Sequence, residues 1–265
     1  MSKLLIYIVI FSAFIFGYIK YLERRGIYYP IKEISFTPQD INLPFEDAYF
    51  TTEDNLRLNA WLIPKADSKY TIMLFHGNAG NIGDRIDKIK LLYDAGASIF
   101  IVDYRGYGKS RGSPSEEGFY KDAIAAYNYL VNERKIDSRR IVLYGESIGN
   151  AVAIHLAAQV KTKALIVEGG FSRGRDMAKT IYPFLPNFLF ADSFDCIAKI
   201  KSNNTPKLFL HSRQDEIVPF ELAKKLFDAA PQPKEFVELI GGHNTAFLDS
   251  GQLYPSSVKA FLEKI

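Results

Sequence analysis

The sequence is poor in cysteine and histidine, and its charges are balanced. The single cysteine, Cys196, cannot form an internal disulfide, and no group of cysteines and histidines has metal-ligand spacing, so no metal site is expected. Lysine and arginine total 33 against 30 acidic residues, and the two signs are interleaved, which gives nucleic-acid binding no support. Neither glycine-rich segment, 77–80 or 106–112, has the spacing of a phosphate-binding loop.

Length and composition fit one globular domain. Hydrophobic residues make up 48% and charged residues 24% of the 265 residues, which indicates neither disorder nor a repeat array. A single α/β domain commonly has about 200 to 250 residues. We therefore expect one folded domain over residues 28–265, with residues 28–30 and the region of Pro38 and Pro44 as an extended linker onto it.

One long uncharged run, LLIYIVIFSAFIFGYI, lies at the N-terminus over residues 4–19. It is slightly shorter than the ~20 residues of a full span, but its apolar neighbours extend it and Lys20 can snorkel. No small-residue cleavage site follows, which favours a retained anchor over a removed signal peptide. We expect residues 1–27 to form a single-pass membrane anchor, although a core helix that is apolar on all sides is the alternative. The basic residues that follow the run favour a cytoplasmic domain by a thin margin.

Apolar runs alternate with helical stretches from residue 70 onward. Strands are expected at 71–75, 98–102, 141–144, 164–167, 207–210 and 235–239. Helices are expected at 85–94, 114–133, 148–159, 220–229 and 256–264. This alternation predicts an α/β fold with a mostly parallel sheet and helices on both faces, preceded by an antiparallel hairpin of residues 46–51 and 56–63. Ser113 as N-cap, with Glu116 closing a capping box, predicts that the second helix begins at Pro114.

The segment Gly145-Glu146-Ser147-Ile148-Gly149 joins an apolar strand to a helix. A serine on so sharp a turn exposes its hydroxyl, and the flanking glycines remove the Cβ atoms that would collide in the bend. The helix that follows directs its free N–H groups at the same point, where negative charge develops during acyl transfer. The pattern indicates a nucleophile elbow with Ser147 as the attacking residue, and an ordinary tight turn is the alternative.

Such a serine requires a base, and in this topology the order along the chain is serine, acid, histidine. Of the four histidines, His76 precedes Ser147 and His155 lies on the helix beyond it. His211 lies at a strand end before any suitable acid loop. His243 remains, in a glycine-flanked loop after the last strand, where its imidazole can accept the serine proton.

The acid is expected in a loop at the carboxyl end of a strand, where it can orient the imidazole and stabilise its cation. Asp215 fits this position best. Glu216 and Glu168 are the alternatives, and each would need its longer side chain to bridge a different gap. An oxyanion hole also needs two backbone N–H donors, one of which we expect from Ile148 and the other from the loop of residues 76–81.

These motifs together resemble the α/β-hydrolase superfamily. The segments that carry the likeness are HGNAGN, VDYRGYGKS, GSPSEEG, GESIG followed by AVAIHLA, and the late GGHN. More narrowly, they are similar to membrane-anchored abhydrolase-domain proteins that act on ester or thioester bonds, some of which are protein depalmitoylases and some peptidases. The resemblance extends from Tyr28 to the C-terminus. It implies a catalytic domain over residues 28–265. No cofactor is expected, because protein groups supply the nucleophile, the base and the electrophilic stabilisation of this mechanism.

Carried over to this chain, the resemblance implies specific roles at the site. Ser147, Asp215 and His243 would form the catalytic triad, with Asn78 and Ile148 as oxyanion donors. It further implies that residues 103–106 form a structural loop. Two alternatives remain: a serine peptidase or amidase of the same fold, and a catalytically silent, membrane-tethered binding module.

The segment between the expected strands at 164–167 and 207–210 is where this superfamily inserts a lid. Here it is short and rich in large apolar residues: Phe171, Ile181, Tyr182, Phe184, Leu185, Phe188, Leu189, Phe190 and Phe194. These side chains either pack a small helix onto the sheet or line a channel for an acyl chain. In the second case Phe171, Tyr182 and Phe184 would bind substrate, and we expect a medium or long acyl ester or thioester, such as a lipid or a lipidated protein.

Overall fold

The computed structural model describes residues 5–11, 14, 17–18, 26–184 and 193–265. The strands are β1 (Tyr29–Pro30), β2 (Glu46–Thr51), β3 (Arg57–Ile63), β4 (Thr71–Phe75), β5 (Ala79–Gly80), β6 (Ser98–Asp103), β7 (Ile141–Glu146), β8 (Ala164–Glu168), β9 (Lys207–Ser212) and β10 (Lys234–Leu239). The helices are α2 (Ile86–Asp94), α3 (Glu116–Asn128), α4 (Gly149–Ala157), α5 (Gly174–Ile181), α6 (Cys196–Ile200), α7 (Phe220–Ala229), α8 (Ala246–Asp249) and α9 (Leu253–Lys264).

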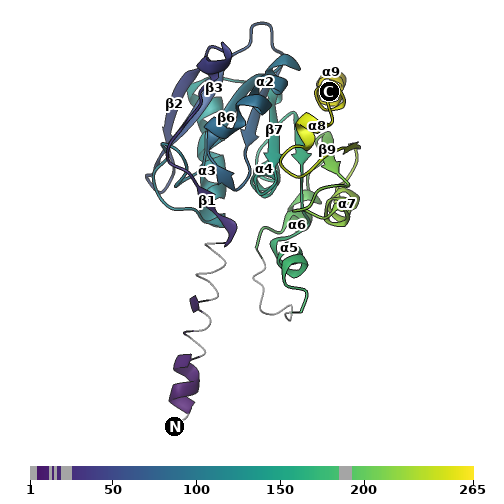
Figure 1. Cartoon of the computed structure of the whole chain (residues 1–265). Coiled ribbons are helices and arrows are strands. Elements are labelled where there is room, and N and C mark those ends of the chain that lie inside the picture. Colours follow the sequence, from purple (N-terminus) through teal and green to yellow (C-terminus); the bar gives the residue numbers. More distant parts are fainter. Residues whose placement is uncertain (1–4, 12–13, 15–16, 19–25, 185–192) are drawn as a thin grey trace.

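The centre of the fold is an eight-stranded sheet in the order β10-β9-β8-β7-β4-β6-β3-β2 (Figure 1). β3 is antiparallel to its two neighbours, β2 and β6, and the remaining neighbours are parallel. This arrangement confirms the predicted hairpin and the mostly parallel sheet. Because parallel strands share one direction, the loops after β4, β6, β7, β8, β9 and β10 meet at one edge, where ligand sites of such sheets lie.

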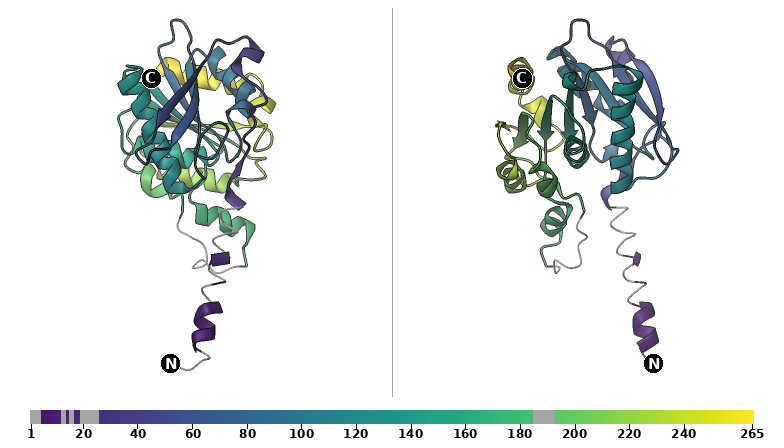
Figure 2. Two further views of the ribbon diagram at one scale, coloured as in Figure 1. Left: turned by 90° about the vertical axis from the view of Figure 1, so that its left-hand side faces the viewer. Right: turned by 180° about the vertical axis from the view of Figure 1, so that it is seen from behind.

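Helices cover both faces of the sheet (Figure 2). α3, α4, α6 and α7 pack on one face, against a core that includes Met73 and Leu143. α2 and α9 pack on the other face, against Leu74 and Val142. Neighbouring residues of a strand point to opposite faces, so a strand covered on both sides must be apolar at every position. The central strands β4 and β7 therefore read as continuous apolar runs.

The predicted strand boundaries agree with the structure to within two residues, but two predicted helix starts are wrong. The last helix, α9, begins at Leu253, three residues before its predicted start at residue 256. α3 begins at Glu116, and the Ser115 side chain caps it by accepting a hydrogen bond from the Gly118 amide at 3.1 Å. The Glu116 carboxylate does not close a capping box with Ser113; it accepts a hydrogen bond from the Phe194 amide at 2.8 Å. The residue predicted to close the capping box, Glu116, is therefore bonded to Phe194, which is distant in the sequence.

The N-terminal part of the chain enters the fold at β1, which pairs in parallel with β5 in a small second sheet. The segment predicted to be a plain linker, residues 28–30, is thus a structural element. Tyr28 packs against the core, and its ring contacts that of Phe119 at 5.2 Å between centroids.

The predicted membrane anchor, residues 1–27, lies mostly outside the described residues, which omit 1–4, 12–13, 15–16 and 19–25. Residues 5–11 are helical, and their side chains are exposed. In the part of the chain that the structure describes, no helix is long and apolar enough to cross a membrane. The anchor and the domain boundary after residue 27 therefore stay predictions.

Candidate active site

The turn between β7 and α4 has the geometry of an elbow. Ser147 has a φ of 54°, in the left-handed region that residues with a side chain rarely adopt. A Cβ on Gly145 would lie 2.5 Å from the Cα of Asn150, and one on Gly149 would lie 2.1 Å from the carbonyl oxygen of Phe75. Only glycine fits at either position. The turn is held in place because the Ser147 amide donates to the carbonyl of Glu168 at 2.9 Å.

Three side chains from different loops form a continuous hydrogen-bonded chain at the carboxyl edge of the sheet. His243 Nε2 lies 2.9 Å from Ser147 Oγ, and His243 Nδ1 lies 2.7 Å from Asp215 Oδ2. The other oxygen, Asp215 Oδ1, accepts from the amides of Ile217 and Val218 at 3.0 and 2.7 Å. The structure thus brings together the three residues that the sequence predicts as a triad.

The Asp215 carboxylate is electrostatically suited to hold a histidine cation. Burial raises its pKa, but the hydrogen bond and charge of His243 and the Val218 amide outweigh burial, so the pKa lies below its ordinary value. A second histidine, His211, lies 3.6 Å from Asp215 Oδ2 and contacts the Val218 carbonyl at 2.9 Å. Burial lowers the pKa of His211. Sequence reasoning set this residue aside, and it lies at the back of the acid loop rather than near Ser147.

The two alternative acids have other partners. Glu216 Oε2 accepts from the backbone amide of His243 at 2.9 Å, so this carboxylate holds the histidine loop rather than the imidazole. Glu168 is buried, and its Oε2 lies 2.7 Å from Lys88 Nζ and accepts from the Tyr144 hydroxyl. Of the three candidate carboxylates, Asp215 is therefore the one bonded to the imidazole of His243.

The loop after β4 lies directly beside Ser147. A Cβ on Gly77 would lie 3.6 Å from the Ser147 Cβ, so the backbone of this loop approaches the serine closely. Among the described residues, the amides of Asn78 and Ile148 have no hydrogen-bond acceptor. The Asn78 side chain turns away, since its Nδ2 donates to the carbonyl of Ile27 at 2.9 Å. Backbone amides, rather than the asparagine side chain, are thus the groups available to a developing oxyanion.

A buried charge network behind the elbow was not anticipated from the sequence. Arg85 donates through Nε to Glu146 Oε2 and through Nη2 to the carbonyl of Ala79, each at 3.0 Å. Lys88 Nζ lies between Glu146 Oε1 at 3.0 Å and Glu168 Oε2 at 2.7 Å. Burial raises the pKa of Glu146, but the charges of Lys88 and Arg85 outweigh it and hold the pKa well below its ordinary value. The network connects the elbow to the loop after β4. In the sequence, the only hint of this network near Ser147 is the neighbouring charged residue, Glu146.

Comparisons with known proteins identify the family and the fold. The model of the alpha/beta hydrolase fold family matches residues 70–189. The alpha/beta hydrolase domain-containing protein WAV2 of Arabidopsis thaliana is 36% identical, over 91% of this chain and 88% of that protein. The chain belongs to the alpha/beta hydrolase fold family. An uncharacterized membrane protein of Saccharomyces cerevisiae is 34% identical, over 85% of this chain and 82% of that protein. An esterase of Pyrococcus furiosus shares the fold with a TM-score of 0.75 at 21% identity, over 90% of this chain and 98% of that chain.

The side chains predicted to bind substrate in this hydrolase fold are not alike in burial. Phe171 is buried in the core on the face of the sheet that α3, α4, α6 and α7 cover, as the packing alternative expects. Tyr182 and Phe184 lie just beyond the end of α5, 48% and 78% exposed, with their ring centroids 6.4 Å apart. The residues 185–190 predicted to extend this apolar cluster lie outside the described residues. Tyr182 and Phe184 are therefore the two members of the predicted set that remain accessible.

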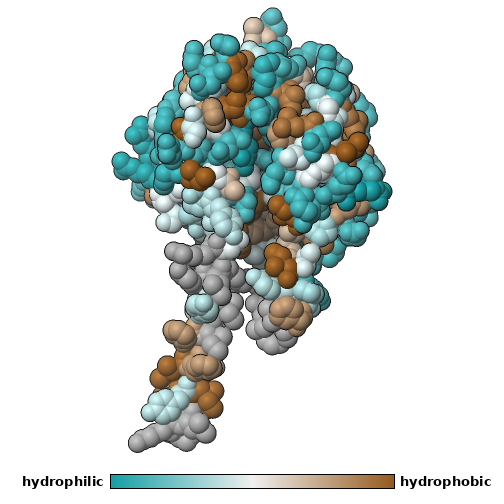
Figure 3. Space-filling view, in the orientation of Figure 1, coloured by the Kyte–Doolittle hydropathy of each residue, from teal (hydrophilic) through white to brown (hydrophobic). Residues whose placement is uncertain are grey.

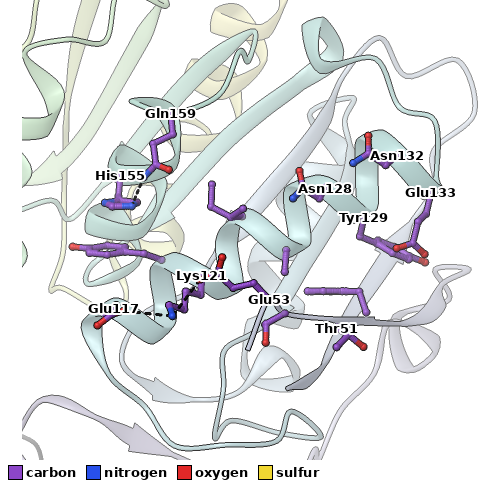
Figure 4. Close-up of a pocket in the computed structure, with 15 residues that line it drawn as sticks. Thr51, Glu53, Glu117, Lys121, Asn128, Tyr129, Asn132, Glu133, His155 and Gln159 are labelled. Carbon is purple, nitrogen blue, oxygen red and sulfur yellow. Dashed lines mark hydrogen bonds and ion pairs between the residues drawn. The ribbon is translucent and has the colours of Figure 1, made fainter. Parts of the chain in front are cut away.

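A separate groove of about 560 Å³ runs along α3, between β2 and α4 (Figure 4). Its labelled residues include Thr51 from β2, Lys121 from α3 and His155 from α4, and none of its lining residues belongs to the predicted site. The His155 ring stacks on Tyr120 at 3.7 Å between centroids, and burial lowers its pKa to about 4. His155 therefore faces this groove as a neutral ring, away from Ser147.

Proposed function

We propose that this hydrolase-fold protein is a serine hydrolase that cleaves an acyl ester or thioester through an acyl-enzyme intermediate. The observation that carries the proposal is the chain of hydrogen bonds from Asp215 through His243 to Ser147, at 2.7 and 2.9 Å, on a strained elbow. A serine hydroxyl is a weak nucleophile by itself, and a base oriented by a third group activates it. The esterases among the structural neighbours agree with this reaction class.

In the first half of the reaction, Ser147 Oγ attacks the acyl carbon while His243 Nε2 takes the serine proton. Asp215 stabilises the imidazolium through Nδ1. The amides of Asn78 and Ile148 donate to the oxyanion of the tetrahedral intermediate, where preorganised donors contribute most to the rate. The intermediate collapses as His243 returns the proton to the leaving alcohol or thiol, which leaves the acyl group on Ser147.

In the second half, water replaces the leaving group. His243 takes a proton from the water as it attacks the acyl-enzyme, and a second tetrahedral intermediate uses the same two amides. Collapse releases the carboxylic acid and returns the proton to Ser147. Protein groups supply the nucleophile, the base and the electrophilic stabilisation, so the reaction needs no metal or cofactor.

We place the substrate at a membrane surface. Apolar side chains gather on the N-terminal helix and at the end of α5 (Figure 3). At the end of α5, Ile181, Tyr182 and Phe184 are exposed. β1 and α5 lie at the same end of the molecule (Figures 1 and 2). A patch of this kind next to a predicted anchor suits an acyl chain that is drawn from a bilayer, as in a lipid or a lipidated protein. A relative that is named a membrane protein adds support.

Labelling with a fluorophosphonate probe tests the reaction class. The wild-type protein should be labelled, and Ser147→Ala should not, with an unchanged melting temperature because the hydroxyl contributes little to packing. A wild-type protein that is neither labelled nor active on any ester would instead be the silent binding module.

A substrate panel separates the remaining alternatives. We expect kcat/KM for p-nitrophenyl esters to rise with chain length, because each buried methylene contributes about 0.8 kcal/mol. Matched oxyesters and thioesters of the same acyl group then decide the leaving group. Efficient cleavage of aminoacyl amides would place the enzyme among the peptidases, and a profile that peaks at acetate would exclude an acyl site.

A further inference from the structure

The segment that follows the predicted anchor is bonded to the loop that carries Asn78. In the ladder of β1 and β5, Tyr29 pairs with Ala79. The Tyr29 amide donates to the carbonyl of Asn78 at 3.0 Å, and the Ile31 amide donates to the carbonyl of Gly80 at 3.0 Å. These bonds join positions about 50 residues apart in the sequence.

Side chains strengthen the same connection. Asn78 Nδ2 donates to the carbonyl of Ile27 at 2.9 Å, and Asn81 Nδ2 donates to the carbonyl of Ile31 at 3.1 Å. The Ile31 carbonyl also accepts from the Gly108 amide at 3.0 Å. Residues 27–31, which we call the strap, are therefore fixed to the domain at both ends and bonded to the loop in between.

The peptide units on both sides of Asn78 are held by named partners. The carbonyl of Gly77, which shares a planar peptide unit with the Asn78 amide, lies 2.7 Å from His76 Nδ1. Because the carbonyl and the N–H of a trans peptide point in opposite directions, this contact directs the Asn78 N–H away from His76. The carbonyl of Asn78 accepts from the Tyr29 amide at 3.0 Å and from the Tyr107 hydroxyl at 2.7 Å. Tyr29 therefore fixes the peptide unit that follows Asn78, and the Asn78 Cα joins this unit to the one that carries the N–H.

We propose that the strap is a positioning element for the oxyanion donor Asn78, so that the segment leaving the membrane anchor sets the rate of the chemistry. The inference rests on the proposed hydrolase function and deepens it. Ile27, which is bonded to Asn78, follows the predicted span by about eight residues. Because eight extended residues reach at most about 29 Å, the loop that carries Asn78 stays within that distance of the end of the span. With the predicted anchor in the bilayer, the acyl group is accordingly presented within this distance of the membrane.

The full-length chain allows a matched test at one position. Tyr29→Pro removes the amide that bonds Asn78, in extended backbone that proline adopts, whereas Tyr29→Ala keeps the amide and trims a side chain that is 53% exposed. On a soluble short-chain ester we expect kcat of Tyr29→Pro to be about tenfold to a hundredfold below that of Tyr29→Ala, with KM within about twofold, because small misplacements of this kind act on the transition state.

A boronic acid that forms a tetrahedral adduct with the serine gives a second readout. Its Ki should rise in Tyr29→Pro by about the same factor as kcat falls, which a general loss of folded protein would not produce. Asn78→Ala removes only the bond to Ile27, and we expect a loss of about threefold to tenfold in kcat relative to wild type at an unchanged melting temperature. This variant decides the matter if Tyr29→Pro does not fold.

The outcomes separate the strap from the reaction class. Should either variant, once shown to be folded, match its control in kcat and in Ki, the strap has no positioning role. In that case labelling and turnover of the wild type would still support the hydrolase. A wild-type chain with no labelling and no turnover would instead remove the proposed function itself.

Discussion

Two histidine–aspartate pairs lie at the carboxyl edge of the sheet, one on each side of Ser147. His76 and Asp103, after β4 and in β6, are both 0% exposed, with His76 Nε2 3.5 Å from Asp103 Oδ1. His243 and Asp215, after β10 and β9, lie 2.7 Å apart, with side chains that are 7% and 3% exposed. The residue types are the same, but only the second pair reaches the serine.

Hydrogen bonding explains the difference between the pairs. In the first pair, His76 Nδ1 contacts the Gly77 carbonyl, and within the described residues His76 Nε2 and Asp103 Oδ2 have no hydrogen-bond partner. In the second pair both ring nitrogens are used, one on the acid and one on Ser147. Burial raises the pKa of Asp103, whereas the partners of Asp215 keep its pKa below the ordinary value. Under the proposed function, His243 therefore acts as the base because its second nitrogen meets Ser147, and His76 has no such contact.

The largest expected effect comes from removing the two histidines in turn. His243→Gln should lower kcat by about 10⁵- to 10⁶-fold, since the base of the triad is lost. His76→Gln should lower kcat by about tenfold to a hundredfold, because this ring holds the peptide unit of the Asn78 N–H but contacts no reacting group. Ester turnover and melting temperature of both variants check the prediction, and a His76 variant that is the more damaged catalytically would reverse the comparison.

Among the three candidate acids, only the loss of Asp215 should lower kcat strongly, and by less than the loss of His243. Asp215→Asn should reduce kcat by about 10⁴-fold, because the amide favours the wrong imidazole tautomer. Glu168→Gln and Glu216→Gln serve as matched amide controls, and each should stay within about fivefold of wild type at temperatures where it is folded. If Glu168→Gln were the damaging change and Asp215→Asn harmless, the assignment of the acid would be wrong.

The link between the elbow and the loop after β4 should matter less again. Arg85→Gln breaks the contacts to Glu146 and to the Ala79 carbonyl, and we expect kcat to fall about tenfold with little change in KM. Lys90→Gln, which removes only an exposed pair with Asp94 on the same helix, is the control and should leave kcat unchanged. Equal kcat in the two variants would show that the network is structural alone.

The smallest expected effect is on the pH dependence of stability, which should differ between Asp215 and Asp103. The folded pKa of Asp215 is depressed, so its contribution is present above the unfolded value of 3.8 and is lost as the pH falls through the folded pKa. The stability gap between wild type and Asp215→Asn should therefore close below about pH 4. The folded pKa of Asp103 is raised, so wild type should lose stability relative to Asp103→Asn as the pH rises from about 4.

Urea unfolding of the three proteins between about pH 2.5 and 7 measures these slopes. Each unit of difference between folded and unfolded pKa corresponds to about 1.4 kcal/mol. Slopes of the same sign for the two variants would contradict the contrast between the pairs.

The course of the strands and the position of the elbow could be predicted from sequence because both depend on neighbouring residues. Apolar runs mark strands buried on both faces, and the glycines at 145 and 149 are required by contacts that any such turn creates. The start of α3 was misplaced by two residues, because Glu116 bonds Phe194 instead of capping its own helix. Local pattern carries no information about such a partner.

Chain order also singled out His243, since each loop follows a strand whose direction the alternation of helices and strands implies. Asp215 was ranked first because its loop follows a strand and because Glu216 and Glu168 would each need a longer side chain to bridge a different gap. Only the tertiary structure decided which carboxylate touches the imidazole, because Asp215 and Glu216 are adjacent and differ in which group of His243 they bond. It likewise brought Tyr29 to Asn78 and Arg85 to Glu146. Such contacts join residues that are distant along the chain, and their geometry is set by how the layers pack, which no local spacing encodes.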